Sequence, residues 1–252
     1  PEAVKRASAP WNCLTLPAVP ALWRTWLEAD AIPTNLRLAI SAGAPLPLEL
    51  EREVLETRGL KIHNFLGASE CGGIAYDRST TLRPGPEFVG SAMDRVGLSC
   101  DGDGHLVVKS PSVASGYWPA SDPRLGDGRY TAADLVRIDA DGSVWIRGRA
   151  GDQINVAGRK VGPERVEQAL MAHGAVRDCL AFGVPDASGR GEAVAIVYSL
   201  RSEISERELK EFLVARLAPW EVPRRWWRRD SLETDVRGKR SRSAWRERLL
   251  GP

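Results

Sequence analysis

Four Asp-Gly pairs in the middle of the chain restrict its fold more than any other feature. They are Asp101-Gly102, Asp103-Gly104, Asp127-Gly128 and Asp141-Gly142. Short apolar runs lie between them, at residues 105–109, 135–138 and 143–146. Asp-Gly between apolar runs is a strong signal for tight hairpins. Residues 95–148 are therefore predicted to form a small antiparallel, barrel-like sheet.

The residues before this sheet alternate between strand and helix signals. Residues 36–40 and 61–66 are predicted strands, and residues 47–58 between them are a predicted helix that Gly59 ends. A strand, a helix and a second strand in succession are typical of an α/β layer. We therefore predict an α/β layer at residues 1–94, which with the antiparallel sheet makes one domain over residues 1–148.

The residues after the sheet predict a separate α+β domain at 149–252, of ordinary domain size. A helix starts at Pro163, and two apolar runs at 176–184 and 193–199 are predicted buried strands. Ser205 and Glu208 form a capping box before another helix. The joint is predicted at residues 149–152, where Gly151 can take backbone angles that a hinge needs. We expect this smaller domain to be mobile.

The composition excludes several classes of protein. The 252 residues include 35 basic and 33 acidic side chains, so no strong field favours nucleic acid. The arginines at 224–229 and 237–248 are typical of a solvated face, although they would also attract a nucleotide. The four cysteines and three histidines are scattered, which argues against a metal cluster and for a reducing, cytoplasmic compartment. No apolar run approaches the roughly 20 residues of a membrane span.

One turn, residues 67–71, contains side chains that could carry chemistry. Its sequence, Gly-Ala-Ser-Glu-Cys, nearly matches the nucleophile elbow of hydrolases, but Cys71 stands at the required second glycine. We therefore rank a serine hydrolase far below a structural turn. Alternatively, Ser69 could hydrogen-bond a phosphate, and Glu70 could hold Mg²⁺, which prefers one or two carboxylates plus phosphate oxygens.

Three further charged residues have no specific meaning when taken singly. Asp134 could bind a ribose diol but is more simply a turn aspartate at the start of a strand. Arg149 is a loop arginine unless a nucleotide lies near it. Lys239 lies in an arginine-rich tail, where a solvated charge is the simpler interpretation.

The order of short motifs along the chain is much more specific. They read LPAVPALW (16–23), LRLAISAGAPL (36–46), FLGASE (65–70), GHLVVKSPSVASGYW (104–118), GRYTAADLVR (128–137), GRAGDQINVAGRKVGPERVE (148–167), GVPD with GE (183–186 and 191–192) and GK (238–239). In this order they resemble the adenylate-forming superfamily, which includes acyl-CoA synthetases, peptide-synthetase adenylation domains and firefly-type luciferases. The resemblance covers nearly the whole chain. It implies that residues 1–148 are the C-terminal part of the family's large AMP-binding domain.

The resemblance implies a role for each of these residues. Gly43, Ala44 and Pro45 would line the adenine of ATP, together with Leu66 and Gly67. Ser69 would contact the α-phosphate, Glu70 would bind Mg²⁺, and Asp134 with Arg149 would hold the ribose. Lys239 would bridge the acyl carboxylate and the α-phosphate. That step needs positive charge where the pentavalent phosphate develops, which lysine and Mg²⁺ supply.

The resemblance also implies a second step, in which coenzyme A attacks the acyl-adenylate. In the family the small domain swings on its hinge, here at Gly151, and brings the Gly158 loop to the pantetheine channel, with Lys160 near phosphate. The acyl pocket would include Ala42, Ala68, Cys71 and Ile74. These residues are small or apolar, which favours a fatty or aryl acid over an amino acid.

The chain departs from the family pattern in places. Leu66 replaces an aromatic residue, Ala132-Ala133 replaces Thr-Gly, Gly151 replaces an acidic or basic hinge residue, and His105 replaces a glutamate. Family members are roughly twice as long, and the family's Ser/Thr/Gly-rich phosphate loop is absent from these 252 residues. We therefore expect a truncated, cleaved or split protein with little adenylation activity as this chain alone.

Three alternatives stay open at the level of sequence. The acceptor could be an acyl carrier protein, since the basic C-terminal face would suit an acidic partner. The chain could instead be a non-catalytic nucleotide- or acyl-binding relic. A serine hydrolase using Ser69 is the most distant alternative.

Overall fold

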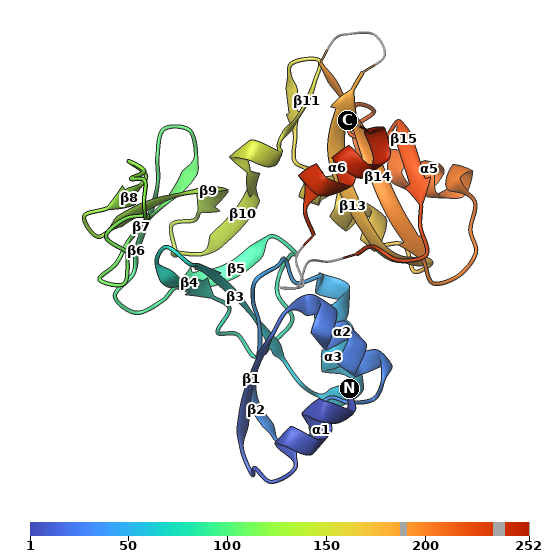
Figure 1. The fold of residues 1–252 in the computed structure, drawn as a ribbon. Helices are drawn as coiled ribbons and strands as arrows, with labels where there is room; N and C mark the ends of the chain where they lie inside the picture. The colour runs from blue at the N-terminus through green and yellow to red at the C-terminus, as the bar shows by residue number, and fades with distance from the viewer. Residues whose placement is uncertain (187–190, 234–239, 252) are drawn as a thin grey trace. The chain divides into compact units, whose positions relative to one another are not determined.

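The computed structural model describes residues 1–186, 191–233 and 240–251. The chain divides into two compact units, residues 1–147 and residues 148–252. Each unit has its own hydrophobic clusters. In Figure 1 the first unit runs from blue to yellow-green and the second from yellow to red.

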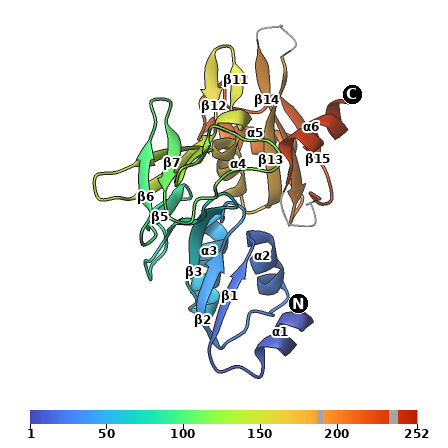
Figure 2. The same cartoon turned by 60° about the vertical axis from the view of Figure 1, so that its left-hand side comes forward.

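The first unit begins with a parallel layer of α/β type. Its strands and helices are α1 (Glu2–Ser8), β1 (Leu14–Ala18), α2 (Pro20–Glu28), β2 (Leu36–Ser41), α3 (Leu48–Arg58) and β3 (Ile62–Ala68). Strands β1 and β3 both pair with β2 in parallel. Helices α2 and α3 lie along these strands (Figures 1 and 2). Buried Trp23, Leu50 and Val54 pack against Ala39 and Ile62. Helix α3 ends at Gly59, in the left-handed conformation (φ 61°), as predicted.

The rest of the first unit is antiparallel, and its hairpins follow the Asp-Gly pairs. The strands are β4 (Gly72–Tyr76), β5 (Phe88–Ala92), β6 (Gly97–Cys100), β7 (His105–Lys109), β8 (Leu125–Gly126), β9 (Arg129–Ile138) and β10 (Val144–Arg149). Asp127-Gly128 joins β8 to β9, and Asp141-Gly142 lies between β9 and β10. Gly104, Gly128 and Gly142 all have positive φ, which these turns require.

The two layers form one continuous sheet, which differs from the separate small sheet that we predicted. The strand order is β1-β2-β3-β4-β5-β10-β9-β7-β6, with β8 paired to β9. Strand β3 joins the layers because residues 62–64 pair with β2 in parallel, whereas residues 65–68 pair with β4 antiparallel. The predicted mixed α/β class is confirmed, but the boundary near residue 94 is not a break in the sheet.

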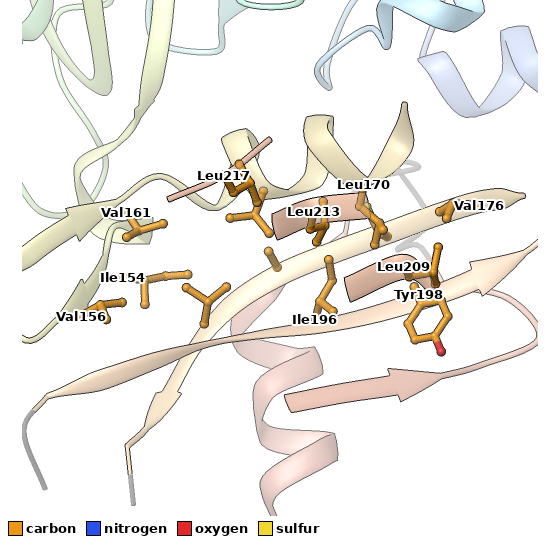
Figure 3. Close-up of a cluster of buried hydrophobic side chains, with 14 residues drawn as sticks. Ile154, Val156, Val161, Leu170, Val176, Ile196, Tyr198, Leu209, Leu213 and Leu217 are labelled. Atoms are coloured by element: carbon orange, nitrogen blue, oxygen red, sulfur yellow. The ribbon is translucent and has the colours of Figure 1, made fainter. Parts of the chain in front are cut away.

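The second unit is a three-stranded sheet covered on both faces. Its elements are η1 (Ala150–Asp152), β11 (Ile154–Val156), β12 (Arg159–Val161), α4 (Pro163–Met171), β13 (Val176–Pro185), β14 (Glu192–Leu200), α5 (Glu206–Val214), β15 (Arg225–Arg228) and α6 (Arg242–Leu250). Cys179 and Ala181 face the cluster of α4 and α5, whereas Leu180 and Phe182 face that of α6. Figure 3 shows the first of these clusters. Both faces are buried, so the strands read as continuous apolar runs.

Local signals that we read from the sequence are present in this unit. Helix α4 has Pro163 at its first position. Helix α5 is capped by Ser205 and Glu208 in a reciprocal capping box, as predicted. All four cysteines of the chain are free thiols, as their spacing predicted. Within the described part of the chain, every helix is too short or too polar to cross a bilayer.

Candidate active site

The first group of candidate residues lies at the carboxyl end of the parallel strands. The β2–α3 connection carries Ala42, Gly43, Ala44 and Pro45, and β3 carries Leu66 and Gly67 into its turn. Because β2 and β3 are parallel, these segments leave the sheet at the same edge. Ligands of α/β proteins bind at this edge. Gly43 has φ 86°, and a side chain there would contact Val19, which follows β1.

The turn between β3 and β4 presents Ser69 and Glu70 at its tip. The backbone N–H of Cys71 donates to the carbonyl of Ala68 at 3.2 Å, which closes a four-residue turn around them. Ser69 is exposed and Glu70 is partly exposed. Gly67 is required for packing, because a Cβ there would lie 2.9 Å from the Phe65 ring.

Glu70 is held by a loop that is distant in sequence. The Tyr117 hydroxyl donates to Glu70 Oε1 at 2.7 Å, and the Ala114 N–H donates to the Glu70 carbonyl at 2.8 Å. The carboxylate opposes ionisation of the phenol, so it raises the pKa of Tyr117 to about 12. Tyr117 is therefore a neutral donor at physiological pH, and the Glu70 side chain has a defined orientation.

The predicted ribose ligand Asp134 lies inside a strand, not at a strand start as we expected. Strand β9 begins at Arg129 and continues past Asp134. Between the pairs Val107↔Thr131 and His105↔Leu135, β7 advances two residues and β9 advances four. The excess residues form a bulge next to Asp134, which is partly exposed. Bulges are frequent beside active sites, where they redirect a side chain.

The four proposed acyl-pocket residues do not share one environment. Ala42 and Ala68 are partly exposed near the edge described above. Cys71 and Ile74 are fully buried in the cluster that packs under the antiparallel strands. Burial raises the pKa of the Cys71 thiol to about 11, so this thiol is unreactive. Ala42 and Ala68 are thus the accessible members of this group, and Leu66 of the proposed adenine site is partly exposed as well.

The predicted hinge at residues 149–152 contains Gly151, and Gly148 precedes it; the two glycines have different backbone conformations. Arg149 ends β10 and is exposed, and Gly151 lies in the 3₁₀ turn η1. In this conformation Gly151 does not use the backbone freedom of glycine, because its φ is outside the left-handed region and a Cβ would contact nothing. Its hinge role stays a prediction. Gly148 has the unusual conformation instead, with φ 130°. A Cβ on Gly148 would lie 3.2 Å from Glu164 Oε2.

Gly158 and Lys160 belong to the β11–β12 hairpin of the second unit. The hairpin turn is Ala157-Gly158, and both residues have positive φ (50° and 88°). Gly158 and Lys160 are exposed. The turn is therefore a protruding backbone loop with a basic residue on the following strand.

Lys239 lies outside the described residues, but the segment that follows it is firmly held. Arg240 pairs with Asp178 of β13. Arg242 Nη1 lies 2.6 Å from Asp152, and Nη2 lies 3.0 Å from both Glu164 and Glu167. Burial raises the pKa of Glu167, and Arg242 opposes that shift. These pairs tie the start of α6 to β13, α4 and the turn η1.

Comparisons with known proteins identify the family of this chain. The family model described as "AMP-binding enzyme" matches residues 1–118, and the model "AMP-binding enzyme C-terminal domain" matches residues 165–239. The chain belongs to the adenylate-forming superfamily. Relatives in this superfamily include a 4-hydroxybenzoate–CoA/benzoate–CoA ligase of Rhodopseudomonas palustris, 32% identical over 93% of this chain and 48% of the relative. A 2,3-dihydroxybenzoate-AMP ligase of Bacillus subtilis is 32% identical over 92% and 47%.

Solved structures of the superfamily have the same fold. ATP-bound MatB from Rhodopseudomonas palustris is 25% identical, with a TM-score of 0.87, over 99% of this chain and 53% of that protein. The amide bond synthetase McbA from Marinactinospora thermotolerans is 25% identical, with a TM-score of 0.84. The chain spans about half the length of the curated relatives it matches.

Sequence reasoning missed residues that act through tertiary contacts. Tyr117 was quoted within a superfamily motif, but its contact with Glu70 joins positions 47 residues apart. Arg242 was counted only as part of a basic tail. The available signal was its place three residues after Lys239.

Proposed function

We propose that this chain forms the second half of a ligase that activates a carboxylic acid with ATP and passes it to coenzyme A. The observation that carries the proposal is the match of both superfamily models, in order, along one chain. The first step releases pyrophosphate and forms an acyl-adenylate. The second step forms a thioester and releases AMP.

In the first step, the acid's carboxylate attacks the α-phosphorus of ATP, and the bond to pyrophosphate breaks. Negative charge develops on the oxygens of the pentavalent phosphorus, so donors and cations placed there lower the barrier. We assign the Ser69 hydroxyl to the α-phosphate. Lys239 would bridge the attacking carboxylate and the α-phosphate.

The side chain of Glu70 fits a Mg²⁺ ion that is also bound by the phosphates of a nucleotide. Glu70 is partly exposed, and Tyr117 hydrogen-bonds Oε1. Across the described residues, groups of three or more potential metal ligands are absent. This suits Mg²⁺, which is usually held by one or two carboxylates with phosphate oxygens and waters completing the site. When bound, Mg²⁺ neutralises charge on the phosphates.

The nucleoside would lie along the carboxyl edge of β2 and β3. The Gly43–Pro45 segment and Gly67 allow close approach of adenine to the backbone, and Leu66 supplies an aliphatic contact. An aliphatic side chain cannot stack on a base as an aromatic ring does, so we expect weaker adenine binding than in relatives with an aromatic residue there. Asp134 would accept hydrogen bonds from the ribose hydroxyls, and Arg149 would assist.

In the second step, the thiol of coenzyme A attacks the carbonyl carbon of the acyl-adenylate, and AMP leaves. We assign the exposed Gly158 turn to the pantetheine channel and Lys160 to a phosphate group. This requires the second unit to rotate about the joint at residues 149–152. Gly148, with its unusual φ, lies directly beside this joint.

The acid is proposed to be aryl or fatty. Ala42, Leu66 and Ala68 are the accessible apolar residues at the proposed pocket. The relatives' names include 4-hydroxybenzoate, feruloyl and long-chain fatty-acid ligases, and also a malonate–CoA ligase. An amino acid is less favoured, since its ammonium group would need a carboxylate partner in the pocket.

Coenzyme A is preferred over a carrier protein as the acceptor because most of the described arginines in the two basic segments pair with nearby carboxylates. Six arginines in these segments pair with carboxylates of the same unit: Arg224 with Asp186, Arg228 with Glu203, Arg240 with Asp178, Arg242 with Asp152, Arg246 with Glu192 and Arg248 with Glu233. These pairs reduce the positive field that would attract an acidic carrier.

The two remaining alternatives have less support. A hydrolase would need a histidine beside Ser69, but His63 contacts the Asp77 carbonyl and His105 contacts Asp101. A non-catalytic relic would be expected to lose the Glu70–Tyr117 contact, which is intact. We also propose that the protein acts in the cytoplasm, since all its thiols are free.

ATP–pyrophosphate exchange tests the proposal. We would assay a panel of aryl, fatty and amino acids, on these 252 residues and on a full-length protein carrying them. Acid-dependent exchange in the full-length protein supports the proposal, and the 252 residues alone should show little because the family's phosphate loop is not among them. Robust exchange by the 252 residues alone would contradict that last expectation.

A further inference from the structure

The β11–β12 hairpin, which carries Gly158, is too short to hold its own conformation. Each strand has three residues, and the turn is Ala157-Gly158. Isolated two-stranded hairpins are at best marginally stable, even when longer than this one. Contacts from outside the hairpin must therefore fix the position of its turn.

One such contact comes from Glu192, the first residue of β14. The backbone N–H of Asn155 donates to Glu192 Oε2 at 3.0 Å. The neighbouring residues Val156 and Gly191 form an antiparallel bridge. The hairpin is thus attached to the start of β14 at two consecutive positions, one of them through a carboxylate.

Asn155 passes this restraint to the turn. Its side-chain Oδ1 accepts a hydrogen bond from the backbone N–H of Gly158 at 2.9 Å. Glu192 therefore fixes the backbone of Asn155, and Asn155 fixes the N–H of Gly158. Two hydrogen bonds connect β14 to the tip of the hairpin, and we call this chain the Glu192–Asn155 relay.

Space for the Glu192 carboxylate is built into the sheet. A Cβ on Gly183 of β13 would lie 2.4 Å from Glu192 Oε1, so a side chain at this position would displace the carboxylate from where it is. On its other side, Glu192 Oε1 lies 3.5 Å from Arg246 of α6. Oε1 thus faces α6, whereas Oε2 faces the hairpin.

We propose that Glu192 and Asn155 are positioning residues for the thioester-forming step, acting through the backbone of the Gly158 turn. The inference deepens the proposed function and rests on it. Because the relay ends at Gly158, its loss should slow attack by the coenzyme A thiol. Formation of the acyl-adenylate should not change, since, among the residues that the structure describes, the relay contacts none of those assigned to that step.

The test compares the two half-reactions in a full-length ligase carrying this chain. Glu192→Ala and Asn155→Ala should each lower the single-turnover rate of thioester formation by about 10- to 100-fold, as expected for a lost charge-assisted or turn hydrogen bond. ATP–pyrophosphate exchange should stay within about twofold of the parent.

Glu192→Gln and Asn155→Asp keep the accepting oxygens, so they should restore most of the thioester rate. Arg246→Ala is the matched control, because it removes only the other partner of Glu192.

Amide hydrogen exchange on the 252-residue chain tests the relay without any turnover. Glu192→Ala should raise exchange at Asn155 and Gly158 at least tenfold, and Asn155→Ala should raise it at Gly158 alone. Unchanged exchange would overturn the relay, even if no acid were ever found to be activated. Faster exchange with an unchanged thioester rate would overturn the positioning role. Equal losses in both half-reactions would also overturn it, by showing a general structural effect.

Discussion

At the scale of single residues, the contact between Tyr117 and Glu70 is the one on which the proposed first step depends most. We predict that Tyr117→Phe lowers the pyrophosphate-exchange rate about three- to tenfold and raises the Mg²⁺ concentration needed for half-maximal rate, because Glu70 loses its orienting donor. The measurement is a Mg²⁺ titration of exchange in the full-length protein. Trp118→Ala is the control, since Trp118 is 94% exposed beside Tyr117. An unchanged Mg²⁺ requirement would refute an orienting role.

The two glycines of the joint give a matched pair of predictions. Gly148→Ala should destabilise the second unit by about 1–3 kcal/mol, because a side chain at φ 130° is strained and approaches Glu164. Gly151→Ala should stay within about 1 kcal/mol of the parent, toward higher stability, because its backbone suits alanine and the unfolded chain loses entropy. Urea unfolding measures both. Equal effects of the two substitutions would contradict this assignment.

The sequence motifs predicted which residues lie in the turns of the proposed site, but they did not predict which side chains contact one another there. Ser69, Glu70 and Gly158 were identified from motifs, and they lie in turns as expected. The Tyr117–Glu70 contact was not predictable, because it depends on how a loop after β7 crosses the β3–β4 turn. The φ angles near the joint were not predictable for a related reason, since the chain has glycine at positions 148 and 151 and only coordinates show that Gly148 has the positive φ.

At the scale of elements, the central strand β3 explains which parts of the fold were predictable. The strand itself and α3 follow from local patterns, and both were predicted nearly to their ends. The change from parallel to antiparallel pairing along β3 has no local signal, because the same residues would suit either partner. Strand β4 was missed as well, since Gly72 and Gly73 read as part of a loop.

A buried charge network joins α3 to the strands that follow it. Arg83 Nε lies 2.5 Å from Glu51, and Lys61 lies 2.6 Å from Asp77. Arg83→Leu should destabilise the first unit by about 3–5 kcal/mol, because fully buried Glu51 would lose one of its two cationic partners and keep only Lys61. Arg58→Leu, which breaks the exposed Arg58–Asp30 pair, should cost at most about 1 kcal/mol. A small effect of Arg83→Leu on urea unfolding would contradict this ranking.

The same network predicts the acid sensitivity of the first unit. Burial alone would raise the pKa of Asp77, but hydrogen bonds from Lys61 and Ser79 hold it below the ordinary value of 3.8. The stabilisation is therefore complete above about pH 4 and is lost as the pH falls through the lowered pKa. Lys61→Met should weaken this pH dependence of unfolding. An unchanged acid transition in Lys61→Met would show that other carboxylates dominate.

At the scale of the whole molecule, the two units have separate cores. Clusters around Ile196 and Phe182 belong to residues 148–252, and clusters around Ile74 and Trp23 belong to residues 1–147. We predict that residues 148–252, expressed alone, fold and unfold cooperatively, as a domain with its own core does. Circular dichroism during thermal unfolding measures this. A non-cooperative transition would mean that the second unit depends on the first.

The measurement that tests the central claim most directly is ATP–pyrophosphate exchange in the full-length protein, with and without Lys239→Ala. We predict exchange that depends on an aryl or fatty acid and that falls by at least about 100-fold in Lys239→Ala, since we propose that this lysine stabilises the transition state of the first step. Exchange that is absent with every acid, or that survives the loss of Lys239, would contradict the assignment of this chain to an acid-activating ligase.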